Sequence, residues 1–200
     1  MQVNTKAGMT FPKALRSFLR ADPDVILVGE MRDGETASIG IQAALTGHFV
    51  LSTVHANSAS AVPTRLIDMG VEPFLVASSL RGVISQRLVR KLCDKCYEPI
   101  KVSDTIKKAF PWVGAPPSTL YKAHEDGCAH CHRTGYDGRT TIAEVLIMDD
   151  DISALVSRNA TAHELEALAV QSGMITILQD GLNRAAQGIT SIEELSRVVG

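Results

Sequence analysis

The sequence predicts an α/β fold with a parallel sheet, an irregular cysteine-containing module and a small C-terminal helical bundle. Two β-rich runs, at 25–28 and 49–54, alternate with helical patterns near the start of the chain. Such alternation is typical of parallel strands joined by crossover helices. Prolines and paired cysteines break the pattern further on, and helix-start signals resume after them. The predicted domains are therefore 1–91, 92–135 and 136–200.

Local signals place the strands and helices of the first domain. The apolar run at 25–28 indicates a strand buried on both faces of a parallel sheet. Asp33 is expected to cap a helix over 34–46, which Gly47 ends. A helix that opens at Ser58 and a further strand over 83–89 complete this domain.

An earlier amphipathic helix begins after Thr10 and ends at Asp22-Pro23. Arg16 and Arg20 lie four residues apart on it, so both are expected on one side. Three capping boxes predict the helices of the C-terminal bundle. These are Thr161 with Glu164, Thr176 with Gln179, and Ser191 with Glu194.

Composition narrows the possible functions. The 200 residues carry a formal net charge of -2, which argues against nucleic-acid binding by bulk electrostatics. No run approaches the roughly 20 apolar residues of a membrane span, and the first residues lack a signal-peptide pattern. We therefore expect a cytoplasmic protein with reduced cysteines.

The four cysteines form two Cys-x2-Cys pairs, Cys93 with Cys96 and Cys128 with Cys131, separated by 31 residues. Two such pairs can complete a tetrahedral thiolate site, which suits a structural Zn²⁺ with no open position for water. Unrelated thiols and a redox dithiol are the alternatives. The neighbouring histidines could replace one ligand, although solvated loop positions suit them better. They are His124, His130 and His132.

Glu30 and His55 each follow a predicted strand. Ligands of open α/β sheets bind at this end of the strands. A carboxylate there can hold Mg²⁺ through water or polarise water that attacks a phosphate, and a histidine can report on a bound phosphate. An ordinary loop glutamate and a half-buried strand-end histidine explain the same pattern.

Arg16, Arg20 and Arg32 could meet phosphates of the chain's own site or a neighbour's, or lie on solvated faces in surface ion pairs. The sequence contains no Gly-x4-Gly-Lys-Ser/Thr motif. No loop in it is therefore expected to cradle the β- and γ-phosphates of a nucleotide.

Several motifs together resemble the type II/IV secretion ATPases. DPDVILVGEMRD at 22–33 resembles their Walker B region, and LTGH through STVHAN at 45–57 resembles their histidine box. RLIDMGVEPF at 65–74 and QRLVR at 86–90 continue the match. The paired cysteines resemble the tetracysteine module of the secretion and pilus-assembly members. The resemblance covers essentially the whole chain.

The resemblance implies the latter half of a RecA-like ATPase core with ATP and Mg²⁺ as ligands of the full-length protein. Glu30 matches the catalytic glutamate, and His55 matches the histidine near the phosphates. Arg16, Arg20 and Arg32 match arginines implicated near the nucleotide interface of a homo-hexamer. Family members dock on an inner-membrane platform of a secretion or pilus system, so the chain is expected to be peripheral to that membrane.

The resemblance also places the phosphate-binding loop upstream of Met1, with only a trailing part of the Asp box, at 2–11, in this chain. A fragment or truncated product is therefore expected, and it should not hydrolyse ATP appreciably alone. A zinc-stabilised interaction module without enzymatic activity is the alternative. The acidic balance and the lack of aromatic-basic stripes weigh against a nucleic-acid-binding zinc ribbon.

Overall fold

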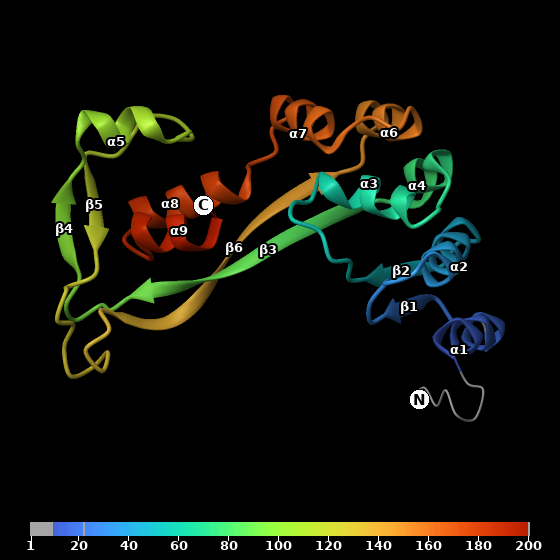
Figure 1. Ribbon diagram of the computed structural model, residues 1–200, viewed down its shortest axis with the longest axis horizontal. Helices are drawn as coiled ribbons and strands as arrows, with labels where there is room; N and C mark the ends of the chain where they lie inside the picture. Colours follow the sequence, from blue (N-terminus) through green and yellow to red (C-terminus); the bar gives the residue numbers. More distant parts are fainter. Residues whose placement is uncertain (1–9, 22, 200) are drawn as a thin grey trace. The chain divides into compact units, whose positions relative to one another are not determined.

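The computed structural model describes residues 10–21 and 23–199 (Figure 1). The chain divides into two compact units, each built from two separate segments. The first unit comprises Met1–Val83 and Leu146–Gly173, and the second comprises Ile84–Val145 and Met174–Gly200. Residues 2–9 of the predicted remnant of the Asp box and Asp22 lie outside the described residues. The domain boundaries at 91 and 135 stay predictions.

The first unit begins with the predicted strand–helix alternation. Its elements are α1 (Phe11–Phe18), the short 3-10 helix η2 (Leu19–Ala21), β1 (Val25–Val28), α2 (Gly34–Leu45) and β2 (Phe49–Ser52). β1 and β2 pair in parallel, from Val25 opposite Phe49 to Val28 opposite Ser52. The predicted cap is present, since the Asp33 side chain accepts a hydrogen bond from Thr36 N. The parallel pairing and the crossover helix are thus confirmed.

One face of this two-stranded sheet is open. Ile26 and Val28 are buried, but Val25 and Leu27 are 58% and 73% exposed. The prediction of a strand buried on both faces is therefore wrong for this structure. Side chains alternate between the faces of a strand, and the described part of the chain covers only the face that carries Ile26 and Val28.

The rest of the first unit is helical. α3 (Ala61–Asp68) and α4 (Pro73–Ser79) follow the sheet, and α6 (Asp150–Ser157) and α7 (Ala162–Gln171) come from the later segment. α4 packs on α6, and α3 contacts α7. Side chains that are almost fully buried hold these helices together. They are Val76, Ile152, Val156 and Leu165.

The second unit contains the strand predicted over 83–89, which is observed as β3, and three strands that the sequence analysis did not predict. β3 (Gly82–Leu92) pairs with β6 (Tyr136–Ile147), and the two run in opposite directions (Figure 1). β4 (Glu98–Lys101) and β5 (Thr119–Lys122) form an antiparallel pair, with α5 (Asp104–Ala109) between them in the sequence. The segment predicted to be irregular therefore holds a hairpin, and a long strand precedes the C-terminal helices.

α8 (Ile177–Ala186) and α9 (Ile192–Val199) complete the second unit. The Thr161 and Thr176 capping boxes are both present, on α7 and α8. The core of this unit is aliphatic. It is formed by Val89, Val102, Leu120, Ile142, Ile177, Leu182, Ala185 and Leu195.

The third predicted capping box is used differently. Glu194 N donates to Ser191 Oγ at 3.2 Å, but the Glu194 carboxylate accepts from Arg90 N at 2.9 Å. The Arg90 and Arg197 side chains also donate to this fully buried carboxylate. The Arg90 guanidinium in turn lies 4.0 Å from the centroid of the Tyr136 ring. Glu194 therefore joins α9 to β3.

None of the helices in the described residues is long and apolar enough to cross a membrane.

Candidate functional site

The ends of the two parallel strands bring together the predicted acid and histidine. Glu30 lies two residues beyond β1, and His55 lies three residues beyond β2. Glu30 Oε1 is 2.8 Å from His55 Nε2. The Glu30 side chain is 21% exposed, whereas that of His55 is 87% exposed. The carboxylate is thus held near the sheet and the imidazole stands in solvent.

Arg32 lies on the other oxygen of the same carboxylate. Its guanidinium is 2.6 Å from Glu30 Oε2. The hydrogen bond from Arg32 lowers the pKa of the Glu30 carboxyl from its ordinary value against the opposing effect of desolvation. Glu30 is therefore ionised at neutral pH, flanked by a cation and by a group that becomes one when protonated.

The two remaining predicted arginines are on α1 and η2. Arg16 forms an ion pair with Glu35 in the first turn of α2, at 3.0 Å. Arg20 is exposed on η2. The structure thus groups Arg32 with Glu30 and His55, whereas Arg16 is paired with a different carboxylate.

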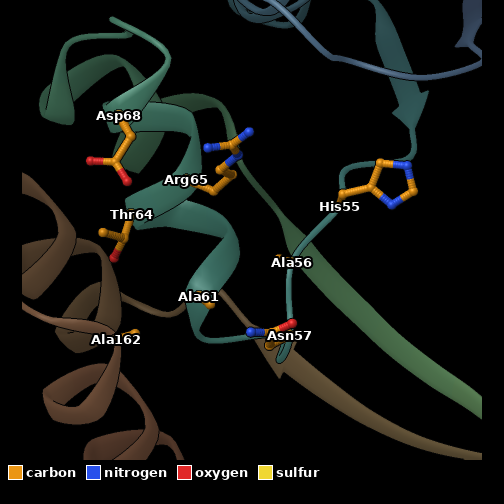
Figure 2. Close-up of a pocket in the computed structure, with 8 residues that line it drawn as sticks. All are labelled: His55, Ala56, Asn57, Ala61, Thr64, Arg65, Asp68 and Ala162. Atoms are coloured by element: carbon orange, nitrogen blue, oxygen red, sulfur yellow. The ribbon is translucent and has the colours of Figure 1, made fainter.

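A shallow pocket of about 440 Å³ lies beside His55 (Figure 2). It is lined by the loop after β2, by α3 and by Ala162 of α7. Figure 2 shows the His55 ring pointing away from α3, while Thr64 and Asp68 lie on the side of α3 opposite Arg65. The polar groups diverge, so this pocket does not form a convergent binding site.

Thr53 is a residue at the strand ends that the sequence did not single out. Its hydroxyl donates to Gly29 O at 2.8 Å, and its carbonyl accepts from Met31 N at 3.0 Å. These bonds flank Glu30 on both sides. The only signal in the sequence was its position two residues before His55. This signal does not distinguish Thr53 from any other threonine at a strand end.

The four cysteines form a second candidate site, in the other unit. Their Sγ atoms all lie within 4.8 Å of one another. The Cys93–Cys128 and Cys96–Cys131 pairs are 3.8 Å apart, and Cys128–Cys131 are 3.7 Å apart. Zn–S bonds of about 2.3 Å in a tetrahedron require S–S separations of about 3.8 Å. The cluster therefore has the dimensions of a tetrathiolate metal site, and its sulfurs are too far apart for disulfides.

The backbone around Cys131 favours the thiolate form of this residue. Cys131 Sγ accepts hydrogen bonds from Cys128 N at 3.1 Å and from Gly135 N at 3.3 Å. These bonds lower the pKa of the Cys131 thiol to about 6, with the bond from Cys128 the larger cause. Burial raises the pKa of the Cys93 and Cys96 thiols. A bound cation would displace their protons and compensate the buried charge.

Two of the three nearby histidines lie beside carboxylates. His130 Nε2 is 3.4 Å from Asp137 Oδ2, and His124 Nε2 is 3.7 Å from Glu98 Oε1. Among the described residues, the cluster with metal-ligating geometry contains only cysteines.

Comparisons with curated proteins find relatives of the chain among secretion ATPases. It is 48% identical over 197 residues to type II secretion system protein E of Pseudomonas aeruginosa and to type II secretion system ATPase E of Vibrio cholerae. These matches cover 98% of the chain but 39% of each relative. The type IV pilus assembly ATPase PilB of Thermus thermophilus is 47% identical over 196 residues, 97% of the chain and 22% of PilB.

Solved structures agree on the α/β fold. The pilus retraction motor PilT, solved with bound ADP, matches with a TM-score of 0.65 and 28% identity, covering 94% of this chain and 43% of PilT. The Legionella pneumophila ATPase DotB has the same fold, with a TM-score of 0.64 and 21% identity over 94% of this chain and 42% of DotB. Residues 1–197 also match the profile of the type II/IV secretion system proteins. The chain belongs to this family.

Proposed function

We propose that this chain is the C-terminal portion of a hexameric ATPase that powers type II secretion or type IV pilus assembly. The observation that carries the proposal is the Glu30 carboxylate, held 2.8 Å from His55 and 2.6 Å from Arg32 at the ends of two parallel strands. The chain matches 39% of the length of the named type II secretion proteins. This partial match supports assigning the activity to a longer protein.

In this proposal Glu30 orients the water that attacks the γ-phosphate of ATP. Arg32 keeps the carboxylate ionised, so it can accept a hydrogen bond from that water. The lowered pKa of Glu30 makes it a weak base, which favours orienting the water over removing its proton early. Mg²⁺, when bound with ATP, would polarise the phosphate.

His55 and the arginines interact with the charged phosphates around this water. His55, exposed beside the carboxylate, is placed to sense the phosphate end of the nucleotide. Arg32, released from Glu30, could neutralise phosphate charge. Arg16 and Arg20, on exposed helical surface, are proposed to face the nucleotide at a subunit interface. The chain lacks a phosphate-cradling glycine-lysine loop, so that part of the site must come from elsewhere.

Cys93, Cys96, Cys128 and Cys131 are proposed to hold one structural Zn²⁺. Support comes from three S–S separations of 3.7 to 3.8 Å and from the hydrogen bonds to Cys131. Four thiolates leave no position for substrate, so the ion would stabilise the hairpin module and would not take part in hydrolysis. The proposed location is cytoplasmic, with the homo-hexamer bound to inner-membrane platform proteins.

A chimera tests the catalytic assignment. Residues 1–200 replace the matching segment of the Pseudomonas aeruginosa relative, and ATP hydrolysis is measured for the purified assembly. Glu30→Gln should lower kcat by about a hundredfold or more, whereas Glu72→Gln, an exposed residue of the same unit, should not. An assembled chimera without activity, or a Glu30→Gln variant with unchanged kcat, would contradict the proposal.

The chain alone should show no appreciable ATP hydrolysis, because it carries no loop that binds the β- and γ-phosphates. The same assay on the isolated 200 residues checks this. Steady turnover that Glu30→Gln abolishes would show that the chain is sufficient.

A further inference from the structure

Hydrogen bonds of Thr53 join the two segments beyond the end of the sheet. Regular pairing of β1 with β2 ends at Val28 and Ser52. Beyond this point the chain forms loops, and in these loops Glu30 and His55 meet at 2.8 Å. Two hydrogen bonds of Thr53 reach the loop that carries Glu30, one just before this residue and one just after it.

Thr53 contacts the main chain on both sides of Glu30. Its hydroxyl donates to Gly29 O at 2.8 Å, while Met31 N donates to its carbonyl at 3.0 Å. The second bond continues the pairing of the strands and needs no particular side chain. The first bond requires a hydroxyl.

Gly29 is the point in this loop that most needs an external restraint. Glycine has the widest conformational range of any residue. Apart from its sequence neighbours, no described atom lies within 4 Å of the position where a Cβ would stand on Gly29. The Thr53 hydroxyl is therefore a specific restraint on the peptide group that carries the Glu30 backbone nitrogen.

We propose that Thr53 is a positioning residue whose hydroxyl fixes the Glu30 carboxylate against His55. The proposal rests on the function proposed above for Glu30. Thr53 acts through the main chain and is not itself expected to touch the nucleotide. Its loss should therefore lower kcat and leave the KM for ATP nearly unchanged.

Two variants isolate the hydroxyl. Thr53→Val keeps the size and β-branching of the side chain and removes the donor, whereas Thr53→Ser keeps the donor. Thr53 and Gly29 are both exposed, so water can satisfy the freed carbonyl and the fold should survive. The midpoint of thermal unfolding of either variant should stay within about 3 °C of the parent.

The experiment measures ATP hydrolysis by the chimeric assembly with Thr53→Val, Thr53→Ser and Glu30→Gln. We expect Thr53→Val to lower kcat about three- to tenfold, since a loosened catalytic group loses part of its orientation. Thr53→Ser should retain kcat within about twofold, and KM should change by less than about twofold in both variants. In a His55→Ala background, Thr53→Val should have a smaller effect than in the parent.

A second measurement is independent of activity. In the isolated chain, hydrogen exchange at the Met31 amide should accelerate in Thr53→Val and remain slow in Thr53→Ser, because its acceptor lies on the same residue. The failures are distinguishable. If Glu30→Gln retains kcat, the proposed function is wrong. If Glu30→Gln is inactive while Thr53→Val retains kcat, or if Thr53→Ser loses as much as Thr53→Val, the positioning role is wrong.

Discussion

The buried carboxylate of Glu194 should make the second unit sensitive to acid. Burial alone would raise the pKa of Glu194, but hydrogen bonds from Arg197 and Arg90 outweigh this and hold the pKa at about 2. The ordinary value is 4.5, so the folded state binds this proton less readily than the unfolded chain. The resulting stability is present above pH 4.5 and is lost as the pH falls towards 2.

The magnitude follows from the same shift. At about 1.4 kcal/mol per pKa unit, the full difference corresponds to an upper limit of about 3 kcal/mol. The side chains of Arg90 and Arg197 are 43% and 58% exposed, so solvent screens both partners. We therefore expect Glu194→Gln to cost about 1–2 kcal/mol at pH 7.

Urea unfolding of the parent and of Glu194→Gln, at pH 7, 4.5 and 3, measures this contribution. The difference between the two free energies of unfolding should shrink between pH 4.5 and pH 3. If the cysteines hold a metal as proposed, its loss at low pH would affect both proteins and cancel in this comparison. Glu193→Gln, at the exposed neighbouring position, is the control and should show no such difference. An equal cost of Glu194→Gln at pH 7 and pH 3 would refute the electrostatic reasoning.

Two further perturbations test other parts of the structure. The purified chain should contain about one Zn²⁺ held by protected thiols. Cys131→Ser or a strong chelator should release the ion and destabilise the second unit. Metal analysis with thiol titration checks the metal content, and freely reacting thiols without metal would contradict the prediction. Gly34→Ala should destabilise the first unit by about 1–3 kcal/mol, because a Cβ there would lie 2.1 Å from Met69 O. Gly29→Ala is the matched control in thermal unfolding, because no described atom other than those of its sequence neighbours lies within 4 Å of a Cβ built on Gly29.

Sequence patterns predicted the helix caps and the strand pairing that short-range interactions determine. The Asp33 cap, the parallel pairing of β1 with β2 and the two threonine capping boxes are confirmed. The meeting of Glu30 with His55 also follows from local reasoning, because parallel strands place their carboxyl ends at one edge. Each of these features depends on residues close in sequence or on one topological rule.

The missed elements depend on distant partners. β6 presents Ile142, Glu144 and Leu146 to the buried side, so a charged residue interrupts its apolar alternation. The buried Glu144 carboxylate accepts a hydrogen bond from Ile177 N, 33 residues away. β4 contains Pro99, which argues against a strand until its antiparallel partner is known. Glu194 likewise has local capping-box spacing, but its carboxylate binds Arg90 across 104 positions of sequence.

The interleaving of the two units has a consequence for the order of folding during synthesis. The first unit needs Leu146–Gly173, so its helical layer can assemble only after most of the second unit has left the ribosome. The second unit in turn waits for Met174–Gly200. Until then β3 and the β4–β5 hairpin lack α8 and α9. The fully buried Leu182 and Leu195 have not yet joined their core. Early metal capture by the cysteines would hold the nascent hairpin together during this interval.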